Sequence, residues 1–218
     1  QRLAGGGQVE QVEQRLPSES DDLALPQARY EAVFSVLDLQ SVNDVPGALI
    51  QMRRALKPDG LLLACLFAGD TLTELRQSWL AAEAAVTGGV SPRVAPMTGV
   101  RELGALLQRA GLALPVADLD RTMVRYADAV ALIHEIRELG LSNALAGRSR
   151  RPVSRRLMGA AVNHYHQHFA DPDGRIRATV EVAWITGWAP HESQQQPLKP
   201  GSAKARLADA LKVEEKKL

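Results

Sequence analysis

The sequence of 218 residues has little of what several protein classes need, with one cysteine, Cys65, and only 4% aromatic residues. A single cysteine excludes an internal disulfide and is typical of a reducing compartment. Cys65 lies within an apolar segment, so we interpret it as a small core residue in preference to a catalytic thiol. No apolar run approaches the roughly 20 residues of a membrane-spanning helix, and the sequence therefore predicts no membrane span.

An excess of charge of either sign is also missing. Lys and Arg number 26 against 25 for Asp and Glu, a net charge of +1, so nothing favours nucleic acid or an anionic membrane as a partner. Hydrophobic residues make up 45% and charged residues 23%, as in an ordinary globular domain. The one charge cluster either docks an acidic protein or a carrier's phosphopantetheine, or forms a solvated surface: Arg148, Arg150, Arg151, Arg155 and Arg156.

The segment from Tyr30 to Phe67 has the pattern of a strand, a helix and a second strand. Residues 32–39 and 61–67 are continuous apolar runs of the length expected for strands buried on both faces. Between them an apolar stripe at helical spacing begins near Asp44, a residue type that caps helices, and ends at the Lys57–Gly60 turn. We expect the glycine of that turn to adopt positive φ. The segment predicts a βαβ unit with parallel strands.

The rest of the chain adds helices and further strands. Residues 175–188 alternate apolar and polar side chains at a period of two, which predicts a strand. Residues 112–116 and 121–126 supply shorter strand segments. Apolar residues at helical spacing predict helices at about 70–85, 98–110, 127–139 and 154–169.

Three histidines in the last of these helices suggest a metal site, but their spacing opposes it. A step of two residues turns a helix by about 200°, so His166 points away from His164 and His168. No cysteine or acid completes a ligand set with the remaining pair. We predict no metal site.

Several motifs, taken together, resemble one protein family. Residues 31–46 (EAVFSVLDLQSVNDVP), followed by LKPDG and a strand, are similar to the segment between the fourth and fifth strands of class I S-adenosylmethionine-dependent methyltransferases. A more distant similarity is to the malonyl-acyl-carrier-protein O-methyltransferase of biotin synthesis. Four further segments resemble the subgroup that contains the methyltransferase-like assembly factor 5 of respiratory complex I and its bacterial relatives: Gly69–Arg76, Gly89–Pro92, Leu106–Gly111 and Gly187–Gln194.

This resemblance implies an α/β fold, a Rossmann-like sheet with helices on both faces and an antiparallel last strand, residues 175–188, inserted beside the strand at 61–67. The family's first strand, its glycine-rich D/E-x-G-x-G turn and its acid-ended second strand have no counterpart before Val9, since a βαβ unit needs about 30 residues. We expect a sheet lacking the first two strands, with residues 32–39 as an exposed edge. Residues 1–190 would form this N-terminally truncated domain, with a small helical cap around 127–170, and residues 191–218 a polar tail.

The resemblance implies S-adenosylmethionine as cofactor and carries a set of binding residues onto this sequence. Asp21 takes the position whose carboxylate accepts from the adenine amino group, although a solvated acidic loop explains it equally well. Gln40-Ser41 replaces the family's His-Trp, and glutamine cannot act as a base near neutral pH. The catalytic residue is therefore unknown. The cofactor-binding candidates are Asp21, Asp22, Ser35, Val36, Leu37 and Gln40.

Four other residues are candidates for the substrate pocket. Asp70 and Glu74, four residues apart, could line a pocket at the carboxyl edge of the sheet, where open α/β folds bind ligands. Asp70 or Thr71 could cap the helix expected at 70–85, and acids that stabilise a helix N-terminus would look identical. The loop at residues 88–96 adds Ser91 and Arg93.

Three functions are compatible with these features. The resemblance implies a methyltransferase, which could act on a carrier-bound acid, or an assembly factor that modifies an arginine on a complex I subunit. The departures from the family pattern suggest a binding module with a degenerate site. The implied partner is a protein, with no nucleic acid and no membrane span. The implied location is the bacterial cytoplasm or, in a eukaryote, the mitochondrial matrix.

Overall fold

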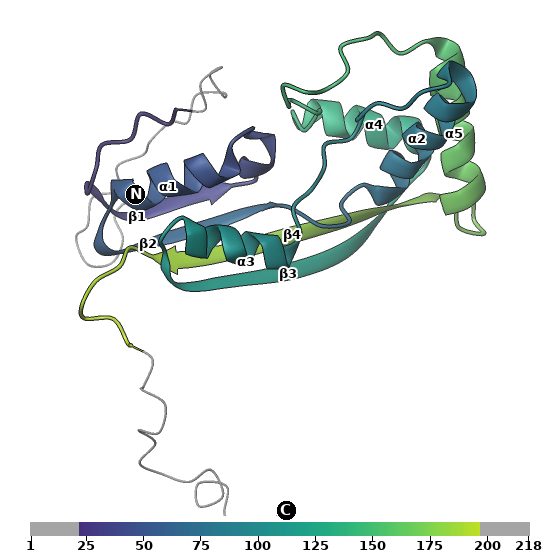
Figure 1. Ribbon diagram of the computed structural model, residues 1–218. Coiled ribbons are helices and arrows are strands. Elements are labelled where there is room, and N and C mark those ends of the chain that lie inside the picture. The colour runs from purple at the N-terminus through teal and green to yellow at the C-terminus, as the bar shows by residue number, and fades with distance from the viewer. Residues whose placement is uncertain (1–21, 197–218) are drawn as a thin grey trace, which may run out of the picture.

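The computed structural model describes residues 22–196, which contain one four-stranded sheet (Figure 1). The strand order is β1-β2-β4-β3, with β1 and β2 parallel and β4 antiparallel to both of its neighbours. This arrangement confirms the mixed Rossmann-like sheet and the insertion of the antiparallel last strand beside β2. The strands are β1 (Tyr30–Val36), β2 (Leu56–Phe67), β3 (Ala113–Tyr126) and β4 (Ile176–Trp188).

Five α-helices and one 3₁₀ turn, η1 (Leu39–Ser41), accompany the sheet within the described part of the chain. The side chain of Asp44 accepts from Gly47 N–H, Asp128 accepts from Val130 N–H, and the Ser154 hydroxyl accepts from Leu157 N–H. Each of these satisfies a backbone donor in the first helical turn. The helices are α1 (Val45–Ala55), α2 (Thr73–Thr87), α3 (Val100–Arg109), α4 (Ala129–Glu138) and α5 (Arg155–Phe169).

The buried side chains form two clusters on opposite faces of the sheet. α1 and α3 pack on β2 and on Ala183 and Ile185 of β4, whereas α2, α4 and α5 pack on Ile176 and Ala178. Odd and even positions of a strand point to opposite faces, so helices lie on both faces, as expected. α2, α4 and α5 cover only the far end of β4, and Trp184, on the same face, is 48% exposed. α2, α4 and α5 gather at the far end of β3 and β4, beyond the end of β2 (Figure 1).

β1 forms one edge of the sheet among the described residues, which agrees with its predicted exposure. Phe34 and Val36, on the face away from α1, are 65% and 71% exposed. Strand β1 ends at Val36, earlier than predicted, and Leu39 to Ser41 form η1 instead.

Three expectations about local structure were wrong. Lys57–Gly60 belongs to β2 and contains a register shift opposite Tyr30 and Ala32. Asp59, with φ +62°, takes the left-handed conformation, whereas a Cβ at Gly60 would lie 2.9 Å from Lys57 O, so this glycine allows close backbone approach. The two strand segments expected at 112–126 form one strand, β3. Neither Asp70 nor Thr71 caps α2 through its side chain.

The segment that follows β2 forms hydrogen bonds with the backbone of β4 beyond the point where β2 ends. Leu72 N–H donates to Thr179 O at 2.8 Å, and Glu181 N–H donates to the Thr71 hydroxyl at 2.9 Å. The buried Glu74 carboxylate accepts from both the N–H and the hydroxyl of Thr179, at 3.0 and 2.5 Å. These bonds replace a sheet ladder and hold the start of α2 on β4.

We expect Gly69→Ala to destabilise the protein by about 1–3 kcal/mol. Gly69 has φ +53°, and an added Cβ would lie 1.9 Å from Oε2 of Glu181, which accepts from Asp70 N–H at 2.7 Å. The change therefore adds backbone strain and displaces a buried carboxylate. Urea unfolding gives the measurement, and Gly88→Ala, at φ +70° with no atom within 4 Å, is the control for strain alone. Equal losses in the two variants would contradict the steric argument.

Candidate functional site

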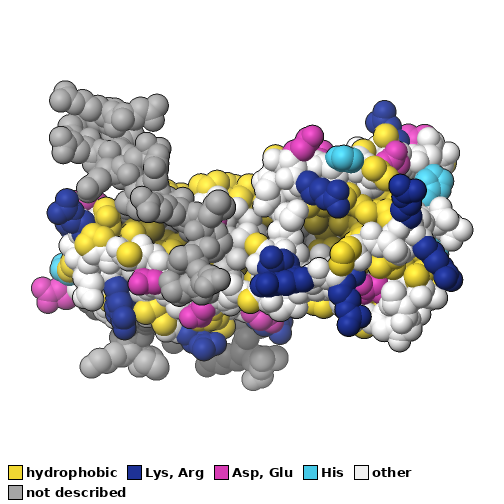
Figure 2. All heavy atoms as spheres, turned by 90° about the horizontal axis from the view of Figure 1, so that it is seen from above, with side chains coloured by type: hydrophobic (Ala, Val, Ile, Leu, Met, Phe, Trp, Pro, Cys, Tyr) yellow, Lys and Arg dark blue, Asp and Glu magenta, His cyan; other side chains and the backbone are white. Residues whose placement is uncertain are grey.

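A cavity of about 410 Å³ opens at the carboxyl end of β2, between the sheet and the cap formed by α2, α4 and the loop that follows α4. Its size suits a side chain or a small ligand. Figure 2 shows an apolar hollow at the helical end of the molecule, bordered by Lys and Arg side chains. The apolar lining includes Phe67, Leu72, Leu75, Trp79, Val94, Met97, Val124, Leu132, Ile133, Ile136 and Val180.

Polar side chains enter this cavity from two sides. Gln40 and Ser41 come from η1, directly after β1, while Tyr126 ends β3 and Glu135 lies on α4. Burial raises the pKa of the Tyr126 phenol, and the charge of Glu135 and its hydrogen bond raise it further. The Tyr126 phenol therefore stays protonated at neutral pH and can donate, and the Glu135 side chain supplies an acceptor beside it.

One wall is held by a buried carboxylate on α2. Glu83 accepts from Ser91 N–H at 2.5 Å, from the Ser91 hydroxyl at 2.7 Å and from Arg93 Nε at 2.7 Å. Burial raises the pKa of the Glu83 carboxyl, but the hydrogen bonds from Ser91 and Arg93 outweigh burial and leave that pKa below its usual value. Arg93, whose guanidinium lines the cavity, is thus already neutralised by Glu83.

The loop between α4 and α5 closes another side and contacts both neighbouring loops. Asn143 donates from Nδ2 to Pro92 O at 3.0 Å, and Ala146 N–H donates to Oδ1 of Asn43 at 2.9 Å. The first contact joins this loop to the Ser91–Arg93 wall and the second to the segment after η1. The loop therefore packs across the cavity, from the Ser91–Arg93 wall to the segment that follows η1 at the end of β1.

The structure brings together some of the residues that the sequence singled out. Gln40 and Arg93 line the main cavity, and Ser91 lies on the wall beside Arg93. Asp21 lies outside the described residues. Asp22 is exposed, and its carboxylate accepts from Ala24 N–H at 2.9 Å, beside α1 and not at the cavity.

The carboxyl end of β1 has the unsatisfied polar groups that a cofactor would use. Ser35 Oγ, Asp38 Oδ2 and Gln40 Oε1 are buried and have no hydrogen-bond partner in the described part of the chain, which is unusual for buried polar atoms. Leu37, between them, has φ +50°, a strained conformation typical of functional sites. Val36 is mainly exposed and points to the other face. These residues fit one side of a nucleoside-type cofactor.

Asp70 and Glu74 do not line the main cavity, contrary to expectation. Glu74 is 6% exposed and its carboxylate is used by Thr179. Asp70 is exposed and lies 3.4 Å from Arg121. Tyr126, Glu135 and Asn143 line the cavity but were missed by sequence reasoning, because only the packing of α4 and its loop against β3 brings them together.

Neither a metal cluster nor a membrane-spanning helix is found between residues 22 and 196. His164 and His168 share a face of α5, as predicted, and stack with ring centroids 4.0 Å apart. His164 Nδ1 lies 3.2 Å from the Ser78 hydroxyl.

Comparison with known proteins agrees with this geometry. Residues 6–64 match the model of a methyltransferase domain family. The chain is 35% identical over 196 residues to "Arginine-hydroxylase NDUFAF5, mitochondrial" of Danio rerio, covering 90% of this chain and 61% of that protein. It is 34% identical over 168 residues to a malonyl-[acyl-carrier protein] O-methyltransferase of Xylella fastidiosa (strain M23), covering 77% of this chain and 55% of the relative.

The fold comparison points the same way. The crystal structure of the YcgJ protein from Bacillus subtilis matches with a TM-score of 0.50 and 14% identity, over 78% of this chain and 68% of that one. The chain therefore has a Rossmann-like fold and carries a match to a methyltransferase domain over residues 6–64. Its sequence is similar to the arginine-hydroxylases named NDUFAF5, and it spans 61% or less of the length of the curated relatives named above.

Proposed function

We propose that the protein containing this chain uses S-adenosylmethionine as its cofactor and modifies a subunit of respiratory complex I during assembly of that complex. The observation that carries this proposal is the 35% identity to the Danio rerio NDUFAF5 arginine-hydroxylase over 90% of the chain. A match of that extent includes the cap and the cavity as well as the sheet. The corresponding location is the mitochondrial matrix, or the cytoplasm in a bacterium.

In this proposal an arginine of the substrate enters the main cavity. Its guanidinium would donate to the Glu135 carboxylate, the lining acid, while Tyr126 stays protonated and orients the group. Arg93 repels the substrate guanidinium only weakly, because its own positive charge is paired with the Glu83 carboxylate. If the modification is a methyl transfer, the cofactor would be held near Ser35, Asp38 and Gln40 and would supply an electrophilic methyl group. The apolar walls exclude water and fix the orientation of the substrate.

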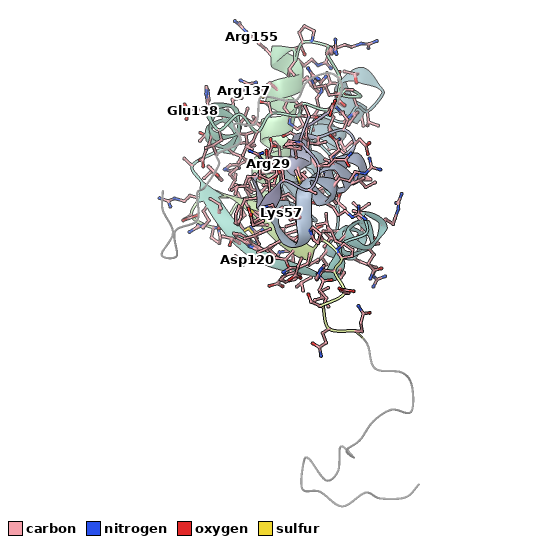
Figure 3. The ribbon with its side chains drawn as sticks, turned by 90° about the vertical axis from the view of Figure 1, so that its left-hand side faces the viewer. Arg29, Lys57, Asp120, Arg137, Glu138 and Arg155 are labelled. Carbon is pink, nitrogen blue, oxygen red and sulfur yellow. The ribbon has the colours of Figure 1, made fainter. Side chains whose placement is uncertain are left out.

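A second candidate substrate is an acid bound to a carrier protein. It is favoured by the lining residue Arg137 and by the arginines at 148–156, since the sequence has no Asp or Glu between Glu138 and Asp171. Arg137 and Arg155 lie on the same side of the molecule, opposite Asp120 of β3 (Figure 3). A cationic border of this kind would attract an acidic carrier and a carboxylate substrate.

Mass spectrometry of the two substrate classes tests these alternatives. A form of the protein extended at its N-terminus by the family's glycine-rich turn, called the longer protein below, would be incubated with S-adenosylmethionine and either complex I subunits or a malonyl-loaded carrier protein. Complex I subunits from cells lacking the protein would be compared with wild type. An arginine that carries an added mass in wild-type cells but not in cells lacking the protein supports the first function. A methyl ester on the carrier-bound acid supports the second. A protein that binds subunits but leaves both substrates and the cellular subunits unmodified would contradict both enzymatic functions.

A further inference from the structure

A second cavity of about 360 Å³ lies beside the main one and is bounded by α2 and residues 90–97. Arg76 and Arg93 supply its only charges. The cavity shares a wall with the main site through Trp79, Arg93, Val94 and Met97. The rest of its lining is mainly apolar, from Leu80, Val90, Pro92 and Pro96.

The two arginines differ in how their charge is balanced. Arg93 is bound to the buried Glu83 carboxylate at 2.7 Å. Arg76 donates from Nη2 only to carbonyl oxygens, those of Thr71 at 3.2 Å and Ala95 at 3.5 Å. Its Nε is buried without a hydrogen-bond partner, and no carboxylate in the described part of the chain forms an ion pair with it.

The position of Arg76 adds to this imbalance. It lies in the first turn of α2, where the helix macrodipole places positive charge and a cation is unfavourable. A half-buried guanidinium at that position, with an N–H that has no hydrogen-bond partner, lowers the stability of the folded protein unless an anion binds to it. The protein therefore keeps a costly cation at the side of an apolar cavity, where the hydrogen bonds of Arg76 to two carbonyl oxygens leave its charge unpaired among the described residues.

We propose that this second cavity binds a carboxylate carried on an apolar chain. The Arg76 guanidinium would donate to the carboxylate, and the chain would lie against Trp79, Leu80 and Met97. The volume fits a chain of a few carbons. This chemistry is shared by a free aliphatic acid and by the C-terminal carboxylate of an apolar peptide. The site goes beyond the proposed function, since it uses neither the cofactor end of β1 nor Glu135.

Calorimetry with a matched ligand series tests the site. Hexanoate and a leucine-rich tripeptide with a free C-terminus are the probes, and hexylamine, hexanol and the amidated tripeptide are their controls. We expect only the carboxylates to bind, with hexanoate alone indicating a free acid and the tripeptide alone indicating a protein C-terminus. Failure of both carboxylates, or equal binding of hexanol, would overturn the proposal.

Variants locate the binding in this cavity. Arg76→Gln should weaken carboxylate binding by at least about tenfold, whereas Arg101→Gln, an exposed change on α3, should leave it unchanged. Leu80→Glu places an acid beside Arg76 and should abolish binding, while Leu80→Gln should retain most of it; Leu80 is 39% exposed and lines only this cavity. Circular dichroism checks folding. Unchanged affinity in folded Arg76→Gln or Leu80→Glu would overturn the assignment.

Discussion

Residues 1–218 alone are expected to bind S-adenosylmethionine in the millimolar range, about a thousandfold more weakly than a longer chain with the family's glycine-rich turn. The sequence contains no D/E-x-G-x-G turn, and among residues 22–196 the end of β1 offers Ser35, Asp38 and Gln40 as its buried polar side chains with an unpartnered atom. Each lost hydrogen bond to the cofactor costs about 1–3 kcal/mol. Several such losses take a micromolar site to the millimolar range.

Isothermal titration of both chains with S-adenosylmethionine measures this difference. In the longer chain, Gln40→Ala should weaken binding while an exposed change on α3, Glu102→Ala, should not. Micromolar binding by residues 1–218 would show that the cofactor needs no glycine-rich turn here.

Glu83→Ala is expected to give the largest loss of stability of any single substitution considered, about 3–5 kcal/mol. The side chains of Glu83 and Arg93 are only 4% and 12% exposed, so the change leaves a nearly buried guanidinium without its carboxylate. It also frees the backbone N–H and hydroxyl of Ser91. The wall between the two cavities would lose its support. Urea unfolding measures the loss.

The exposed ion pair of Lys57 and Glu31 provides a matched control. Its side chains are 46% and 80% exposed, so Glu31→Ala should have little effect because solvent screens the pair. A similar loss in both variants would contradict the role assigned to burial at Glu83.

The Glu83 carboxylate should make the free energy of unfolding depend on pH in the acid range. The pKa of Glu83 is lower in the folded protein than in the unfolded chain, so the unfolded state binds more protons as pH falls. The contribution of Glu83 is then fully present above its unfolded pKa and is lost as pH falls through its folded pKa. Glu83→Gln, which cannot ionise, should flatten this part of the pH profile of unfolding.

Three of the strands and the parallel pairing of β1 with β2 were predictable from local patterns, whereas the antiparallel placement of β4 was predicted from the family resemblance. The apolar runs of β1 and β2 and the alternation of β4 identify three strands without tertiary information. The Lys57–Gly60 segment was mispredicted because glycine in a turn suggests positive φ, whereas here it makes room for the carbonyl oxygens of Lys57 and Glu31.

The site was less predictable than the fold. Gln40 and Arg93 were found because motifs at the end of β1 and after α2 mark them. Tyr126 and Glu135 belong to a strand and a helix whose spacing carries no chemical signal, and only the cap places them in one cavity. Glu74 was predicted to line a pocket from its position after β2. Its carboxylate instead accepts from the backbone N–H of Thr179, on β4, where β2 has ended.

A cavity-filling substitution tests most directly the central claim, that the substrate side chain binds in the main cavity. Ile133 of α4 lines the cavity, whereas Val130 on the same helix is 44% exposed and does not. In the longer protein, Ile133→Trp should lower the rate of substrate modification at least about tenfold, with S-adenosylmethionine affinity unchanged. Val130→Trp should leave both at wild-type values. Modification by folded Ile133→Trp at the wild-type rate would contradict the claim.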